Sequence, residues 1–137
     1  MKKLLAIGIL CLSSISNAYE VPNGYILSAE DVSGNKYYVH KESIRKMGNL
    51  TYVWIISTNH VKFGKNTSAY IRRLYSYNCD TWQNKIVEET FFDDKGEELH
   101  SLELSPPHWR NLPPESVEGF LVKEICAQPK NKEIFGR

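Results

Sequence analysis

Histidines are the side chains best suited to catalysis or metal binding, and the four in this chain are scattered: His40, His60, His100 and His108. None of them belongs to an HExxH segment, a metal-ligand spacing or the GxSxG turn that presents a nucleophilic serine. We therefore expect surface and loop histidines, with no catalytic residue, no metal and no cofactor. A small secreted enzyme is kept as an alternative function.

Carboxylates cluster around Gly96, at Asp93, Asp94, Glu97 and Glu98. Such a cluster could form a carboxylate pair or a calcium site, but it lacks the alternate-residue ligands and the distal glutamate of a calcium loop. Asp and Gly are also typical of tight turns, because of the backbone conformations they adopt. The segment therefore predicts a hairpin turn, and a metal site is the alternative.

The N-terminus has the three parts of a secretory signal peptide. Lys2 and Lys3 precede an apolar run from Leu4 to Leu12, and small polar residues lead to a cleavage point after Ala18. The run is too short to span a bilayer, which takes about 20 apolar residues. We expect an exported chain without a transmembrane span, and an uncleaved N-terminal anchor is the alternative.

The cysteines are Cys11, Cys79 and Cys126. Cys11 lies inside the apolar run and follows the bulky Leu10, where a lipoprotein signal has small residues, so no lipid anchor is expected. Without Cys11, an exported chain keeps one pair, and the oxidising compartment favours a Cys79–Cys126 disulfide. Two free thiols or a metal site are the alternatives, although neither cysteine belongs to a CxxC motif.

The charge balance argues against nucleic acid as the main partner. Removing Lys2 and Lys3 leaves 15 basic and 16 acidic residues, a net charge of −1. Phosphate binding normally requires a marked basic excess. Local basic spots keep polyanion binding as a minor alternative: Lys41, Arg45 and Lys46, and Arg72 with Arg73.

Alternating apolar residues between turn residues predict about six short strands. Their expected ranges are 25–30, 36–39, 50–58, 68–78, 81–92 and 98–104. Residues 40–48 predict a helical turn that places Ile44 under the sheet, and 59–66 predict a loop. Pro106 and Pro107 end the sheet, because proline cannot donate to a strand ladder.

One amphipathic helix is predicted after the strands, with Ser116 as its N-cap. Its apolar residues fall within half a turn of one another: Val117, Leu121, Val122, Ile125 and Cys126. Phe120 lies off this stripe, and we expect it to cover a sheet edge. Strands followed by a helix predict an α+β domain with an antiparallel sheet, and the disulfide ties the helix to one face.

The length of 137 residues allows one domain with a modest core. We expect a signal peptide at 1–18 and a single domain at 19–137. Its core is expected at about 24–127, followed by a short polar tail at 128–137. One helix can cover only one face of a sheet this wide, so the other face must be solvated or occupied by a partner.

Aromatic and arginine residues on the central strands are the candidates for protein binding, because Trp, Tyr and Arg dominate protein interfaces. The candidates are Tyr52, Trp54, Tyr70, Arg72 and Arg73. Ordinary core and rim packing is the alternative for each of them. Counting alternate residues back from Cys79 (parity) places Arg73 on the helix side of its strand. There we expect its aliphatic stem to pack against apolar neighbours, and a role in recognition is the less favoured interpretation.

The chain resembles the surface-adhesin protein E family of Gram-negative bacteria. The resemblance runs from about Tyr25 to Cys126 and is carried by ordered fragments: Lys36-Tyr37-Tyr38, Ser43-Ile44, Gly48, Val53-Trp54, Tyr77-Asn78-Cys79, and Trp109, Leu112, Pro114, Ser116, Leu121 and Cys126. It implies an antiparallel sheet with a disulfide-tied C-terminal helix. It also implies an envelope or surface protein that binds host extracellular matrix and plasma proteins. In two respects the chain departs from the pattern: His40 replaces a common Asp, and the lipid-anchor signal of some members is missing.

The expected function is thus a non-catalytic exported binding module resembling surface adhesin E. Host matrix or plasma proteins, envelope proteins and a second copy of the chain are the partners considered. The expected location is the periplasm, the outer cell surface or the medium. A periplasmic structural or inhibitory partner protein that never contacts a host is the alternative.

Overall fold

The structure is a computed structural model that describes residues 21–103 and 108–127. The expected signal peptide at 1–18, its cleavage point and the tail at 128–137 lie outside these ranges. The two prolines expected to end the sheet lie outside them as well.

The described residues form ten strands, one short 3₁₀ helix at Lys41–Ser43 and one α-helix, α1, at Val117–Cys126. The strands are β1 Tyr25–Glu30, β2 Lys36–His40, β3 Arg45–Met47, β4 Leu50–Ser57, β5 Lys62–Phe63, β6 Asn66–Thr67, β7 Tyr70–Asn78, β8 Gln83–Phe92, β9 Glu98–Glu103 and β10 Arg110–Asn111.

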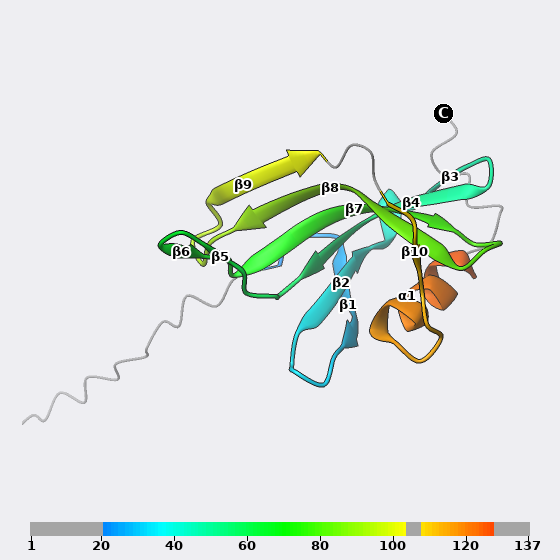
Figure 1. The fold of residues 1–137 in the computed structure, drawn as a ribbon, viewed down its shortest axis with the longest axis horizontal. Helices are drawn as coiled ribbons and strands as arrows, with labels where there is room; N and C mark the ends of the chain where they lie inside the picture. Colours follow the sequence, from blue (N-terminus) through cyan, green and yellow to red (C-terminus); the bar gives the residue numbers. More distant parts are fainter. Residues whose placement is uncertain (1–20, 104–107, 128–137) are drawn as a thin grey trace, which may run out of the picture.

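Eight strands form one antiparallel sheet, in which β1, β2, β4, β7, β8 and β10 follow one another (Figure 1). β3 shares an edge of β4 with β2, and β9 shares an edge of β8 with β10. β5 and β6 form a separate two-stranded hairpin. The expected α+β fold, with an antiparallel sheet followed by one helix, is confirmed.

Four short strands, β3, β5, β6 and β10, were not expected from the sequence. Residues 45–47, placed in a helical turn, form β3 along β4, although the preceding 3₁₀ helix does bring Ile44 against the core. The expected loop at 59–66 contains most of the β5–β6 hairpin, and β10 pairs with the start of β8. Strands of two or three residues are too short to show the alternation that identifies a strand.

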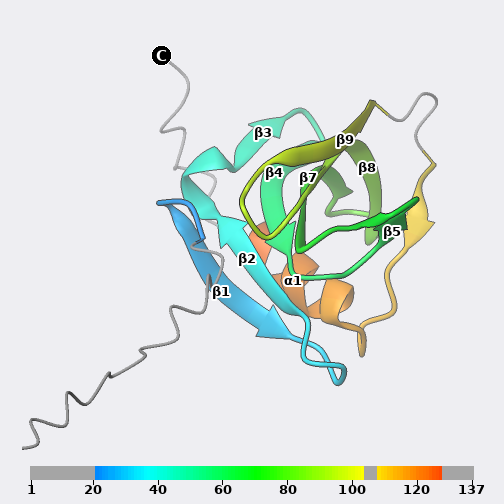
Figure 2. The same ribbon diagram turned by 90° about the vertical axis from the view of Figure 1, so that its left-hand side faces the viewer.

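The helix lies on one side of the sheet, between β1 at one edge and β10 at the other (Figure 2). Beneath it, Val53 and Ile55 of β4 and Tyr75 and Tyr77 of β7 are each at most 5% exposed. These side chains and the apolar stripe of α1 form the core cluster. Removing this apolar surface from water is the main force that holds the helix to the sheet.

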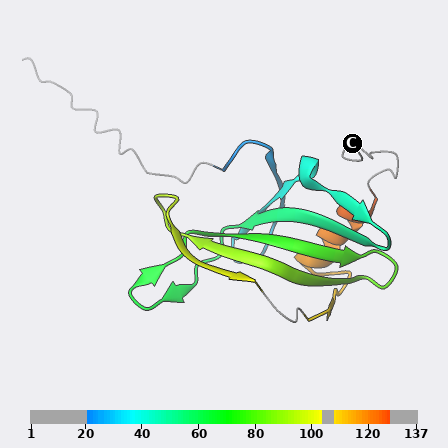
Figure 3. The ribbon, with the colours of Figure 1, turned by 90° about the horizontal axis from the view of Figure 1, so that it is seen from above.

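The β5–β6 hairpin lies at the other end of the sheet from α1 (Figure 3). Phe63 of β5 packs edge-on against Phe91 of β8, with ring centroids 4.5 Å apart. Its connection to β7 is fixed by the buried Ser68, whose hydroxyl donates to the Asn59 carbonyl and accepts from the Val61 amide.

The helix begins as the sequence predicts. The Ser116 hydroxyl accepts a hydrogen bond from the Gly119 amide at 3.0 Å, and Leu121, Val122 and Ile125 are at most 2% exposed. Phe120, which was expected to cover a sheet edge, is 53% exposed. An off-stripe position on a helix with one packed face points toward solvent.

The expected disulfide joins Cys79, just after β7, to Cys126 in the last turn of α1. The Cα atoms are 5.7 Å apart and the S–S distance is 2.05 Å. The bond ties the C-terminal end of the helix to the sheet, while the Ser116 cap fixes its other end.

Candidate functional site

The face of the sheet opposite α1 carries a row of large side chains. Successive strand residues point to opposite faces. The register pairs Trp54 with Leu74 and Ile56 with Arg72, so even-numbered residues of β4 and β7 share the side away from the core tyrosines. This side presents Tyr52, Trp54, Tyr70, Arg72 and Phe92, which are termed the aromatic face.

An arginine sits at the centre of the aromatic face. The Arg72 guanidinium carbon lies 5.3 Å from the centroid of the Trp54 ring and 5.2 Å from that of Phe92. Phe92 also stacks on Tyr70, with centroids 4.7 Å apart and planes inclined by 7°. Cations within about 6 Å of an aromatic centroid are attracted to the ring. The stack therefore restricts where the guanidinium can lie.

The members of this face differ in accessibility. Tyr70 is only 5% exposed, and its hydroxyl lies beside Gly96 of the β8–β9 turn. Trp54, Arg72 and Phe92 are partly buried, as is Tyr52. Tyr70 thus acts as a support for the stack, while the other members keep surface for contact with a partner.

Arg73 is separated from the other four candidates. Its side chain lies on the opposite side of β7 and donates from Nε to Glu89 Oε2 at 2.9 Å, in a pair whose side chains are 20% and 13% exposed. Burial alone would lower the pKa of Arg73, but Tyr75 and Glu89 favour the charged form and raise the pKa. Arg73 is therefore an ion-paired residue beside the core.

Buried tyrosines dominate the helix side. Burial raises the pKa of Tyr75, and it raises the pKa of Tyr77 well above its usual range. Beside them, Arg110 Nη2 donates to Asn84 Oδ1 and to Glu118 Oε1, both at 3.2 Å. This group ties β10, β8 and the first turn of α1 together, so its polar atoms serve the fold.

Two of the histidines lie in strands, His40 in β2 and His100 in β9, and His60 and His108 lie outside them. His40 packs against Tyr25 with ring centroids 4.8 Å apart, His100 lies near Phe63, and His108 is exposed. His60 Nδ1 lies 2.8 Å from the Ser68 carbonyl oxygen. Within 21–103 and 108–127, no three His, Cys, Asp or Glu side chains are placed to hold a metal.

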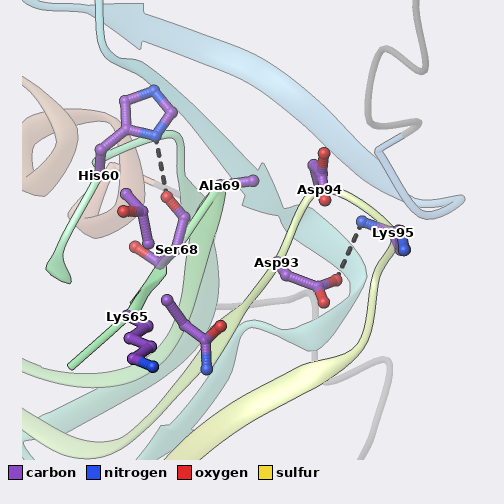
Figure 4. Close-up of a pocket in the computed structure, with 9 residues that line it drawn as sticks. His60, Lys65, Ser68, Ala69, Asp93, Asp94 and Lys95 are labelled. Carbon is purple, nitrogen blue, oxygen red and sulfur yellow. Dashed lines mark hydrogen bonds between the residues drawn. The ribbon is translucent and has the colours of Figure 1, made fainter. Parts of the chain in front are cut away.

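A shallow depression of about 370 Å³ lies between the β5–β6 hairpin and the β8–β9 turn (Figure 4). His60 and Ser68 line one side, and Asp93, Asp94 and Lys95 line the other. Asp93 Oδ1 accepts from the amides of Lys95 and Glu97, at 2.9 and 2.8 Å. The carboxylate thus holds the predicted hairpin turn, and the Ser68 hydroxyl in the depression is bonded to the Asn59 carbonyl and the Val61 amide.

Phe92 is the member of the aromatic face that sequence reasoning did not identify. The register pairs it with Tyr70, but a bulge shifts β8 between the partners of Leu74 and Tyr75. The bulge changes which residues of β8 share a face, so simple alternation along 81–92 would assign the two ends of this strand inconsistently.

A second aromatic site lies at the other end of β8. Lys85 Nζ is 4.6 Å from the centroid of the Trp109 ring, and Trp109 is 39% exposed. The nearby Trp82 is 38% exposed and has a left-handed backbone, with φ of 55°. No local pattern predicts this pairing, since it depends on β10 lying along the start of β8.

The fold and the aromatic face define a class: a disulfide-tied antiparallel sheet with one helix on one side and a row of aromatic side chains on the other. The chain belongs to the surface-adhesin protein E family, whose profile matches residues 25–127. It is thus a surface adhesin-like protein. A comparison with curated proteins gave no significant match.

Solved structures of Haemophilus influenzae protein E share this fold. One is 21% identical, with a TM-score of 0.57 over 79% of this chain and 87% of the other. A second crystal form is 20% identical, with a TM-score of 0.58 over 82% and 94% of the two chains. Protein E from a non-typeable strain is 21% identical, with a TM-score of 0.56 over 82% of each chain.

Within the described ranges, none of the helices has the length and apolar character needed to cross a membrane.

Proposed function

We propose that this chain is an exported, non-catalytic module that binds other proteins through the aromatic face, with host extracellular matrix or plasma proteins as the partner class. The observation that carries the proposal is the stack of Trp54, Arg72 and Phe92 on the sheet face that α1 leaves uncovered. Family membership supports the adhesive role.

The composition and rigidity of the stack favour protein recognition. Trp, Tyr and Arg are the residues that most often carry the free energy of protein association. Here the side chains are held against one another before any partner arrives, so little conformational entropy is lost on binding. An arginine side chain that no neighbour holds in place would lose more rotamer freedom on binding.

Two features support export. The N-terminal sequence has the three parts of a signal peptide, and Cys79 and Cys126 form a disulfide, which is typical of oxidising compartments. Digestion of intact cells with an added protease tests surface display directly. Complete protection of the protein would favour the periplasmic alternative.

Binding by the oxidised chain from Tyr19 to Arg137 tests the proposed surface. The chain is passed over purified matrix and plasma proteins and, in a separate assay, incubated with envelope extract. Trp54→Ala is expected to weaken binding at least about tenfold, as truncation of a central aromatic does at protein interfaces. Phe120→Ala, which removes an exposed aromatic from α1 on the other side of the sheet, is expected to leave binding unchanged.

Equal losses in the two variants would show that binding does not use the aromatic face. Binding that depends on Trp54 but occurs only with envelope proteins would replace the adhesin role with that of a periplasmic partner protein.

A further inference from the structure

Arg72 differs from two other arginines of the fold in having no anionic partner. Arg73 is bonded to Glu89, and Arg110 to Glu118. Among the described residues, Arg72 forms no hydrogen bond or ion pair, and its Nε atom is buried without a partner. Its guanidinium lies instead against the two aromatic rings.

A guanidinium held in this state is costly for a protein. Its donors lose part of their hydration as the side chain becomes partly buried, and an unpaired polar group away from water costs free energy. The rings offset part of this cost, since cation–π attraction is stronger for a partly desolvated cation. They provide no hydrogen-bond acceptors, so the Nη donors, which are not buried as Nε is, stay available.

The described polar residues near Arg72 form no hydrogen bond or ion pair with its guanidinium. Thr90 lies directly opposite Arg72, and Glu88 lies opposite Leu74 in the next row, facing Glu103 of β9. Neither glutamate is ion-paired with Arg72. The Tyr25 phenol lies close enough for the Arg72 charge to oppose the rise that burial causes in the pKa of Tyr25.

We propose that Arg72 binds a carboxylate of an acidic segment in the partner protein, and that Trp54 and Phe92 hold the guanidinium in place for it. The inference rests on the proposed function and adds the chemistry of the partner. The five donors of a guanidinium lie in a rigid fork that matches the two oxygens of a carboxylate. Charge-assisted bonds of this kind are roughly twice as strong as neutral ones.

Charge complementarity selects an acidic protein segment as the occupant. The mature chain has a net charge of −1, so no long-range attraction concentrates polyanions on it. Recognition of negative charge must therefore come from local cations, and Arg72 is the one held within the aromatic face. Apolar rings around it suit a peptide in which acidic residues alternate with apolar ones, because the rings remove apolar side chains from water.

The test uses the oxidised chain and two fluorescent ten-residue peptides, one alternating Glu with Val and the other alternating Gln with Val. We expect the wild-type chain to bind the Glu peptide at least about tenfold more tightly than the Gln peptide, as expected for a charge pair that is partly desolvated. Arg72→Gln is expected to abolish the preference. Arg72→Lys, which keeps the charge but loses the fork, is expected to restore only part of it.

Arg45→Gln is the matched control, because Arg45 is an exposed arginine opposite Tyr52 of the same face. Its preference for the Glu peptide is expected to stay within about twofold of wild type, as for a solvent-exposed charge. Thermal unfolding of every variant establishes that the fold is kept. Equal effects at Arg72 and Arg45 would overturn the proposal in favour of diffuse charge.

Failure of the Glu peptide to bind, or equal binding of the two peptides, would overturn the proposal that the partner segment is acidic. The proposed function would still stand if Trp54→Ala weakens the binding of whole proteins. Sedimentation of the same samples tests the remaining alternative, in which a second copy of this chain occupies the aromatic face. A wild-type dimer that dissociates in Arg72→Gln would assign the guanidinium to a second copy of this chain and would also overturn the proposal.

Discussion

Gly119 in the first turn of α1 lies directly against the carbonyl of Pro113. A β-carbon on Gly119 would overlap the Pro113 carbonyl oxygen and crowd the Pro114 Cα. The segment before the helix therefore folds back over its own first turn, and the contact requires a residue without a side chain. Glycine at this position fixes how the chain enters α1 and so how the helix is placed on the sheet.

Replacing Gly119 by alanine is expected to destabilise the protein, although alanine favours helices by about 1 kcal/mol over glycine. The neighbouring atoms are backbone and cannot move aside as a side chain would. Overpacking of this kind costs about 1–3 kcal/mol, so we expect a net loss in the free energy of unfolding by urea. Lys123→Ala, at an exposed position of the same helix, should change stability by no more than about 0.5 kcal/mol. A more stable Gly119→Ala protein would contradict the contact.

Removing the disulfide by Cys126→Ala is expected to lower the free energy of unfolding by about 2–5 kcal/mol. The bond joins residues 47 positions apart, so it restricts the unfolded chain and also holds the last turn of α1 to the sheet. Cys79→Ala should give a similar loss, since either change breaks the same bond. Melting temperature with and without reductant is the measurement, and equal values for the wild type would rule out a stabilising bond.

Asp31 is expected to make the β1–β2 hairpin sensitive to acid. Hydrogen bonds from the Asn35 side chain, then from the amides of Asn35 and Ser33, and one from the Tyr37 hydroxyl, lower the pKa of Asp31. A carboxyl with a lower pKa in the folded state adds stability above its unfolded pKa and loses that contribution as pH falls through the folded pKa. Asp31→Ala should therefore be less stable than wild type at pH 7, and the gap should shrink below about pH 4.

Urea unfolding at pH 7, 5 and 3 measures this gap. Asp94→Ala, at an exposed turn position, is the control and should show a smaller gap at every pH. A gap for Asp31→Ala that stays constant between pH 7 and pH 3 would mean that the carboxylate charge plays no part.

The fold was predictable from the sequence because its main elements are long and their patterns agree. Parity from Cys79 placed Arg73 on the helix side of its strand, and the structure places it there, beside the core residue Tyr75. The helix stripe included Leu121, Val122 and Ile125, which α1 buries. Each of these predictions depends on a period that repeats along one segment.

Features that depend on pairing between distant segments were not predictable. β10 exists because residues 110 and 111 lie along the start of β8, and the bulge in β8 changes the face of the residues that follow it. The sequence also held no sign of whether Arg72 or Arg73 finds an acidic partner. The two arginines are adjacent in the sequence, and only the register between β7 and β8 shows that Glu89 lies opposite Arg73.

The Arg73–Glu89 ion pair is expected to stabilise the fold more than an exposed pair does. Its side chains are 20% and 13% exposed and 2.9 Å apart, whereas those of Lys41 and Glu124 are 41% and 36% exposed and 3.7 Å apart. A double-mutant cycle with Arg73→Met and Glu89→Met should give a coupling free energy of about 1.5–3 kcal/mol, as for hydrogen bonds to charged groups. The same cycle at Lys41 and Glu124 should give about 0–1 kcal/mol, because water screens exposed pairs. Equal coupling in the two cycles would mean that the partial burial of Arg73 does not strengthen its ion pair.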